Sequence, residues 1–137
     1  MTQPLTQGIH HLGLAVLNAD ETAQFFCSQL GWREVGRNPA YPSVFVTDDT
    51  LTLTLWQVAD PQTATRFDRR ANVGLHHLAL KVADLDTLQA LYERISQLPD
   101  VSPEFAPQPS RPGSPNSHFI CAIPGGLRVE FVAPNAP

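Results

Sequence analysis

Two histidine pairs and one carboxylate are the residues of this sequence best suited to bind a metal ion. The pairs stand at His10–His11 and His76–His77, 66 residues apart, and Glu130 follows a Pro-Gly-Gly segment near the end of the chain. Two imidazole nitrogens and one carboxylate oxygen leave positions on a divalent metal open for water, substrate or dioxygen. A buried carboxylate also needs a cation or a proton, because an unpaired buried charge costs several kcal/mol.

An internal repeat surrounds the histidine pairs. Residues 9–26, IHHLGLAVLNADETAQFF, align without a gap with residues 75–92, LHHLALKVADLDTLQALY. In each copy a short strand leads through an asparagine or aspartate into an amphipathic helix. A repeat of this kind predicts two modules of the same architecture.

Each module is expected to follow the order β, α and then several β. The first helix is expected to end at Gly31, a residue that suits the left-handed turn after a helix. The second helix is expected to bury one face, formed by Leu85, Leu88, Leu91, Ile95 and Leu98. Further strands are predicted at 44–47, 50–58, 117–123 and 127–133.

Strand alternation predicts which histidine of each pair faces away from the helix. The apolar row of each strand must pack against the helix, so the alternating residues face the other way. His10 and His76 are expected on the helix side. The helix-free faces then carry His11, Thr54, Trp56, His77, Arg128 and Glu130. If these faces turn toward each other, His11, His77 and Glu130 converge, and we predict that these three residues bind one divalent metal ion.

Other polar and aromatic side chains are candidates for catalysis or substrate binding. His118 and Tyr41 are the predicted general acids or bases, and a structural role is the alternative for His118 because its strand parity is ambiguous. Arg128 can anchor an anionic substrate or neutralise Glu130. The predicted substrate-binding residues are Phe45, Thr54, Trp56 and Arg128. For the two aromatic rings among them, simple packing is the alternative.

The composition limits the partners of the protein. The chain has 137 residues, 42% of them hydrophobic and 16% charged, and a net charge of −4, so it lacks the basic surface that nucleic acid requires. It has no run of about 20 apolar residues and no signal-peptide pattern, which predicts no membrane association and a cytoplasmic location. Cys27 and Cys121 lack metal-site spacing and are expected to be reduced thiols.

We predict a single domain, residues 1–137, with one module at 8–60 and the other at 73–134. The polar segment at about 61–72, which contains Arg66, Arg69 and Arg70, is interpreted as a solvated linker. Residues 106–116 are rich in proline and are predicted to form a stiff surface loop, with a lid over a pocket as the alternative.

The segments IHHLGLAV, LHHLALKV and IPGGLRVEFVAP resemble the paired βαβββ modules of the vicinal oxygen chelate superfamily. This superfamily includes glyoxalase I, extradiol dioxygenases, fosfomycin-resistance transferases and bleomycin-resistance proteins. The resemblance covers residues 8–134 and implies an α+β fold, an incomplete eight-stranded mixed β barrel with the helices outside, and a homodimer. By position, His11 and His77 match the first-strand ligands of the two modules, and Glu130 matches the carboxylate ligand.

The resemblance implies an enzyme in which a metal ion (Fe, Mn, Zn or Ni, not distinguished by the sequence) acts as Lewis acid and template. Its small substrate would carry two neighbouring oxygens. Thr54 stands where a four-ligand glyoxalase I has a second glutamate, and Ile123 stands where the family turn has an aspartate. Because threonine is not a strong ligand, Thr54 favours extradiol-type dioxygenase chemistry over glyoxalase I, whereas Ile123 changes only the expected capping of the turn. The alternative is a non-catalytic protein that sequesters a small molecule, of the bleomycin-resistance type.

Overall fold

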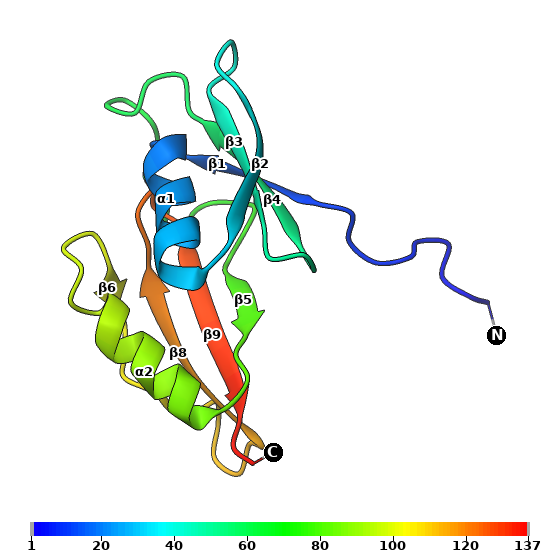
Figure 1. Ribbon diagram of the computed structural model, residues 1–137, viewed down its shortest axis with the longest axis vertical. Helices are drawn as coiled ribbons and strands as arrows, with labels where there is room; N and C mark the ends of the chain where they lie inside the picture. The colour runs from blue at the N-terminus through cyan, green and yellow to red at the C-terminus, as the bar shows by residue number, and fades with distance from the viewer. Residues whose placement is uncertain (1, 137) are drawn as a thin grey trace. The chain divides into compact units, whose positions relative to one another are not determined.

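The computed structural model describes residues 2–136, which divide between two units, Met1–Ala64 and Thr65–Pro137. Each unit has one principal helix and one mixed sheet (Figure 1). The elements of the first unit are β1 (Leu12–Val16), α1 (Ala19–Leu30), β2 (Arg33–Asn38), β3 (Ser43–Thr47) and β4 (Thr52–Gln57). Those of the second unit are β5 (Leu78–Lys81), α2 (Leu85–Ile95), β6 (Ser102–Pro103), β7 (Gln108–Pro109), β8 (Asn116–Ala122) and β9 (Arg128–Pro134).

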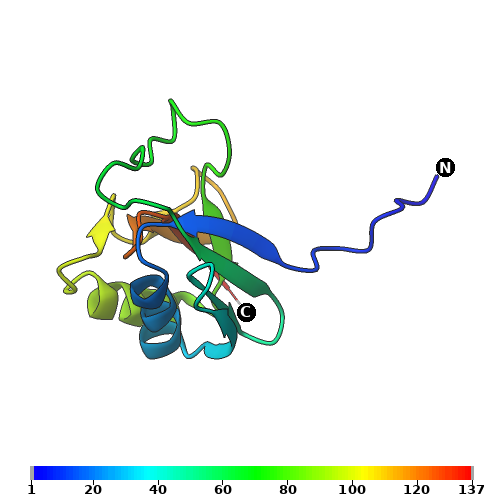
Figure 2. The ribbon, with the colours of Figure 1, turned by 90° about the horizontal axis from the view of Figure 1, so that it is seen from above.

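In the first unit the sheet order is β1-β4-β3-β2, with β1 parallel to β4 and the other pairs antiparallel. Figure 2 shows β1 and β4 side by side, with α1 on one face of the sheet. The apolar residues of each strand alternate, so Leu53 and Leu55 of β4 are fully buried while Thr54 between them is only half-buried. Phe26 of α1 is also fully buried.

The start and end of α1 follow from local chemistry. The Asn18 side chain accepts a hydrogen bond from the backbone N–H of Glu21 at 3.0 Å and so caps the first turn. Gly31 ends the helix with φ at 75°, a left-handed conformation that glycine adopts without strain. The predicted helix end at Gly31 is confirmed.

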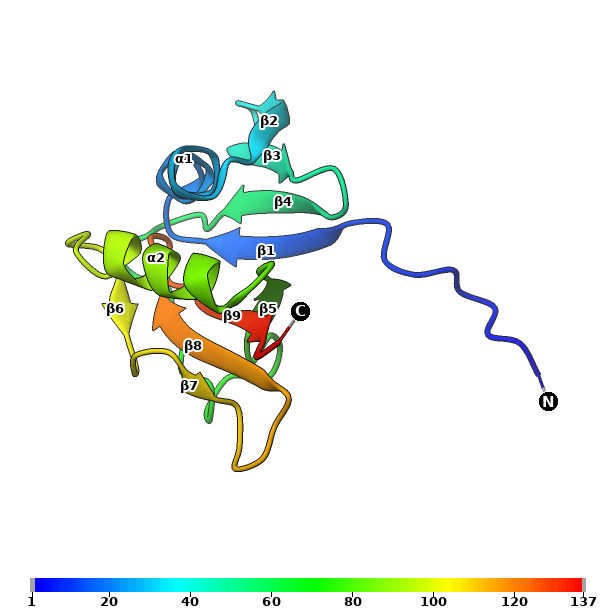
Figure 3. The ribbon, with the colours of Figure 1, turned by 60° about the horizontal axis from the view of Figure 1, so that its bottom comes forward.

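In the second unit the sheet order is β5-β9-β8-β6, and β7 also pairs with β8. Figure 3 shows α2 crossing one face of this sheet over β8 and β9. Phe119 of β8 and Phe131 of β9 are buried under the helix, with ring centroids 5.1 Å apart. β5 runs parallel to β9 just as β1 runs parallel to β4, so the two units repeat the same arrangement. The predicted α+β class is confirmed.

Two local predictions need correction. α2 ends at Ile95, so Leu98 lies outside the helix in a turn closed by its N–H to the Ile95 carbonyl, and Leu85 at the first helical position is 39% exposed. The segment 106–116 is not all loop, because β7 pairs with the edge of β8 there. Proline is tolerated at this edge, where its missing N–H breaks no central ladder.

The two cysteines are free thiols, and burial raises the pKa of Cys121 to about 12. Neither helix in the range 2–136 has the length and hydropathy of a membrane-spanning segment.

Candidate active site

Glu130 is the centre of a polar cluster on the helix-free face of the second sheet. The alternation of β9 buries Val129 and Phe131 against the helix side, which leaves Glu130 facing the other way. Its Oε2 lies 2.5 Å from His118 Nδ1, and its Oε1 lies 3.2 Å from His77 Nε2. The side chains of His118 and Glu130 are 13% and 15% exposed, so both are largely removed from water.

The register of the sheet brings His118 to Glu130. In the antiparallel pairing of β8 with β9, Ile120 lies opposite Glu130, and His118 is the next residue on the same face of β8. A diagonal neighbour of this kind is within reach of a long side chain. The ring of Phe105 packs on the His118 ring with centroids 5.0 Å apart. The strand parity of His118, which the sequence left ambiguous, is therefore that of Glu130.

A chain of polar contacts connects His77 to His76 and Arg128. Arg128 Nη1 lies 3.2 Å from His76 Nδ1, and because a guanidinium can only donate, this His76 nitrogen is an acceptor. The same nitrogen lies 2.8 Å from His77 Nδ1, so Arg128 and the two histidine rings form one connected polar group. The other ring nitrogen of His77, Nε2, faces Glu130.

This donor set fits a divalent cation. His77 Nε2 and Glu130 Oε1 lie 3.2 Å apart, close enough for both atoms to contact one proton or one metal ion. Imidazole nitrogen and carboxylate oxygen are both ordinary ligands of Fe, Mn, Zn and Ni. No group of three His, Cys, Asp or Glu side chains within residues 2–136 is arranged to hold an ion by itself.

The first unit carries the counterpart of this cluster in its own sheet. Gly13 of β1 pairs with Thr54 of β4, and Ala79 of β5 pairs with Glu130 of β9. Since the repeat offset relates residue 13 to residue 79, Thr54 occupies the position of Glu130. His11, the counterpart of His77, is exposed and has its Nδ1 2.8 Å from His10 Nδ1. The first unit therefore repeats the histidine pair but replaces the carboxylate with a hydroxyl.

Four of the predicted site residues of the first unit lie together. Trp56 Nε1 donates to Thr54 Oγ1 at 2.9 Å, and the Trp56 ring contacts the rings of Tyr41 and Phe45 with centroid distances of 4.9 and 5.7 Å. Gly13 lies close beside them, and a Cβ there would lie 3.1 Å from Thr54 Oγ1 and 3.4 Å from Trp56 Nε1, so these side chains would have to shift slightly. The arrangement is an aromatic surface with Tyr41 56% exposed.

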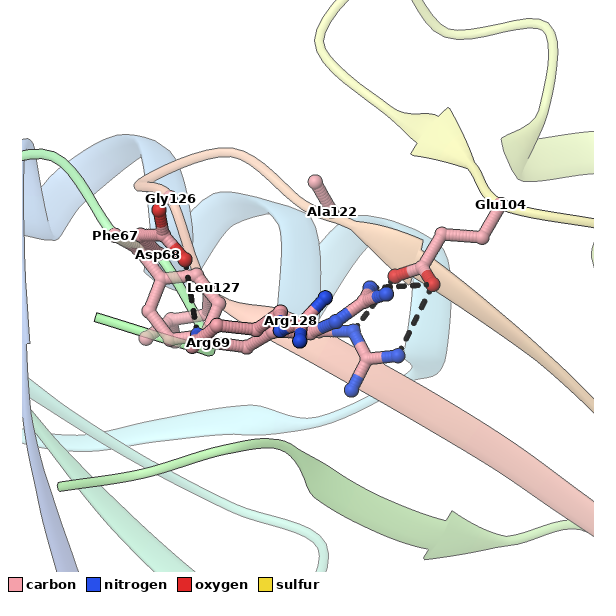
Figure 4. Close-up of a pocket in the computed structure, with 9 residues that line it drawn as sticks. Phe67, Asp68, Arg69, Glu104, Ala122, Gly126, Leu127 and Arg128 are labelled. Carbon is pink, nitrogen blue, oxygen red and sulfur yellow. Dashed lines mark hydrogen bonds and ion pairs between the residues drawn. The ribbon is translucent and has the colours of Figure 1, made fainter. Parts of the chain in front are cut away.

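Arg128 is held from two sides. Its Nε donates to Glu104 Oε2 at 2.7 Å and its Nη2 to Glu104 Oε1 at 3.0 Å, a bidentate pair, while Nη1 reaches His76. Arg69 Nη1 donates to the same carboxylate at 3.0 Å. The hydrogen bonds from Arg128, with the charge of Arg69, hold the pKa of Glu104 below its ordinary value. Figure 4 shows Arg69, Arg128 and Glu104 meeting along one wall of a pocket of the second unit.

Alternation alone did not indicate the role of His76 or of the arginines at 69 and 70. His76 was expected on the helix side, but it precedes β5, where the strand rule no longer directs the side chain, and it contacts Arg128 instead. Arg69 and Arg70 belong to a segment interpreted as a solvated linker, yet both line the pocket of the second unit. The three arginines within residues 66–70 are the sequence feature that could have indicated a cationic site here.

Comparison with known families shows to which superfamily the chain belongs. The sequence profile of the Glyoxalase/Bleomycin resistance protein/Dioxygenase superfamily matches residues 8–131. The chain belongs to this superfamily. The predicted resemblance to the vicinal oxygen chelate proteins is thereby confirmed. A search of curated proteins finds no significant match.

Solved structures of superfamily members share the fold of the chain. A putative glyoxalase from Bacillus halodurans has a TM-score of 0.75 at 22% identity, covering 92% of this chain and 95% of its own. The fosfomycin resistance protein FosX from Listeria monocytogenes has a TM-score of 0.73 at 16% identity, covering 96% and 97%. Lactoylglutathione lyase from Agrobacterium tumefaciens has a TM-score of 0.67 at 20% identity, covering 95% and 96%. These likenesses establish the fold alone.

Proposed function

We propose that the protein is a metal-dependent enzyme of the vicinal oxygen chelate type that acts on a small substrate with two neighbouring oxygens. The observation that carries this proposal is the position of Glu130, a largely buried carboxylate with an imidazole at each oxygen. Two imidazoles beside one largely buried carboxylate are a donor set that can also accept a cation.

His77 and Glu130 are the residues of the second unit that would hold the metal, and His11 is the proposed third ligand. When bound, the metal would supply a Lewis acid that stabilises negative charge on the substrate oxygens. His118 is the proposed acid or base. Its Nδ1–H donates to Glu130, which orients the ring and leaves Nε2 as the nitrogen that can take up or release a proton.

The ligand set favours extradiol-type ring cleavage over the glyoxalase I reaction. Two histidines and one carboxylate are the ligands of non-haem Fe(II) oxygenases. Thr54 at the position equivalent to Glu130 cannot supply a fourth carboxylate, because a neutral hydroxyl is neither a strong ligand nor a base near pH 7. Assays of the iron-loaded protein with catechol and with the thiol adduct of a 2-oxoaldehyde separate the two reactions, and we expect turnover of the catechol.

Elemental analysis of the purified protein tests metal dependence. We expect about one divalent metal per chain in the wild type and loss of most of it in His77→Ala and in Glu130→Ala, with little change in the circular dichroism spectrum. Glu93→Ala is the matched control, since it removes an exposed carboxylate from α2. Full metal retention by either site variant would overturn the proposed ligand set.

A non-catalytic binding protein is the second candidate, and the aromatic cluster of the first unit favours it. Tyr41, Phe45 and Trp56 offer ring faces on which a planar ligand can stack. If this candidate is correct, a planar aromatic ligand quenches tryptophan fluorescence equally in wild type and in Glu130→Ala, and added metal does not alter its affinity. The homodimer implied by the superfamily remains a prediction for either candidate.

A further inference from the structure

The second unit contains a pocket of about 380 Å³ whose walls combine cationic and apolar side chains. Arg69, Arg70, Arg128 and Glu104 supply the charged wall, and Phe67 and Leu127 the apolar one. Figure 4 shows Arg69 and Arg128 reaching toward Glu104 on one side, and Phe67 and Leu127 at the opposite end. The volume lies within the range of small-molecule sites, roughly 300 to 1,000 Å³.

The charge of this pocket is opposite to that of the chain. The protein has nine Lys and Arg residues and a net charge of −4, yet three of the nine line this one pocket. Its two carboxylates do not neutralise them all. Glu104 accepts hydrogen bonds from Arg69 and Arg128, and Asp68 accepts one from the backbone N–H of Arg70 at 2.9 Å. A single positive charge remains.

Arg70 is the cation without a counter-ion. Its guanidinium forms no ion pair with any residue between 2 and 136, in contrast to those of Arg69 and Arg128. Grouping three guanidinium groups costs Coulomb energy, which the two carboxylates Glu104 and Asp68 offset only in part. An anion that enters the pocket would complete the neutralisation, and a guanidinium binds a carboxylate with two parallel hydrogen bonds.

We propose that this pocket binds a small organic carboxylate, with its carboxylate held by Arg70 and Arg69 and its apolar body against Phe67 and Leu127. The apolar wall and the single net charge favour a monoanion with a hydrocarbon part over inorganic phosphate. Arg128 lines the pocket and donates to His76, the neighbour of His77. A further step rests on the proposed function: the same site would bind the carboxylate of an acidic substrate whose reacting oxygens face His77 and Glu130.

Titration of the full-length, metal-free protein with benzoate tests the pocket. Binding is measured by the NMR chemical shifts of the backbone amides. Metal-free protein separates this test from that of metal dependence. We expect shifts at the amides of Ala122, Gly126 and Leu127, which line the pocket, and no comparable shifts with benzamide, the neutral analogue of benzoate. Arg70→Gln should raise the dissociation constant of benzoate about tenfold, because it removes a charge-assisted hydrogen bond.

Arg66→Gln is the matched control, since Arg66 is an exposed arginine of the same segment that does not line the pocket. Its effect should stay within about twofold, as for a screened surface charge. Equal losses in the two variants would overturn the pocket in favour of diffuse attraction. Benzamide binding as tightly as benzoate would overturn the role of the arginines, and phosphate binding as tightly as benzoate would overturn the role of the apolar wall.

Discussion

At the residue scale, the chemistry of the second unit depends on which atoms Glu130 engages. One oxygen accepts from His118 and the other faces His77, so the carboxylate can orient an acid or base and hold a cation at the same time. His76 and Arg128 act at one remove, because Arg128 contacts His76 and His76 contacts His77 Nδ1. Groups behind a metal ligand commonly set its tautomer and orientation in this way.

His118→Asn separates the two roles of His118. The asparagine amide can take the place of Nδ1–H and donate to Glu130, but it has no counterpart of Nε2. We expect the metal content to stay at the wild-type level and kcat to fall by about 10² to 10⁴, the usual contribution of a general acid or base. His118→Leu, which removes both nitrogens, is the comparison. Undiminished turnover by His118→Asn would assign His118 a structural role.

At the scale of elements, the two helices begin with equivalent caps of different chemistry. Asn18 caps α1 and Asp84 caps α2, each through a side-chain oxygen that accepts a backbone N–H. Hydrogen bonds from the Thr87 side chain and backbone hold the pKa of Asp84 below its ordinary value. The contribution of Asp84 is therefore complete above its unfolded-state pKa, and it is lost as the pH falls through the lower folded-state value.

The caps predict different pH responses. Asn18→Ala should lower the free energy of unfolding by about 1 kcal/mol at both pH 7 and pH 3, because asparagine does not titrate. Asp84→Asn keeps a good cap without the charge, so it should flatten the loss of stability below pH 4 relative to the wild type. Urea denaturation at the two pH values measures both. If the free energy of unfolding of Asp84→Asn fell as much between pH 7 and pH 3 as that of the wild type, the role of Asp84 as a titrating cap would be contradicted.

At the scale of the whole molecule, metal binding should stabilise the folded protein. A ligand at 100 times its dissociation constant stabilises the folded state by about 2.7 kcal/mol, so saturating metal should raise the melting temperature of the wild type. If His11 is the third ligand, His11→Ala should weaken metal binding at least about tenfold, or about 1.4 kcal/mol. Gln7→Ala, which changes an exposed residue of the same segment, is the control and should keep the full rise.

Much of the architecture was predictable from local patterns. The repeat at an offset of 66 residues is visible in the sequence. The buried row of Leu53 and Leu55 follows from the side-chain period of strands, and the start of α1 after Asn18 and its end at Gly31 follow from capping chemistry. These features depend on neighbours along the chain, which the sequence displays directly. The family followed from the same segments.

Contacts between side chains of different strands and loops are determined only by the tertiary structure. His118 meets Glu130 because of the register between β8 and β9, and His76 meets Arg128 because a side chain outside a strand is directed by its contacts instead of by alternation. Arg69 and Arg70 enter a pocket because their loop folds back on the second unit. Periodicity specifies the face on which a residue lies, whereas long-range packing determines which side chain it meets there.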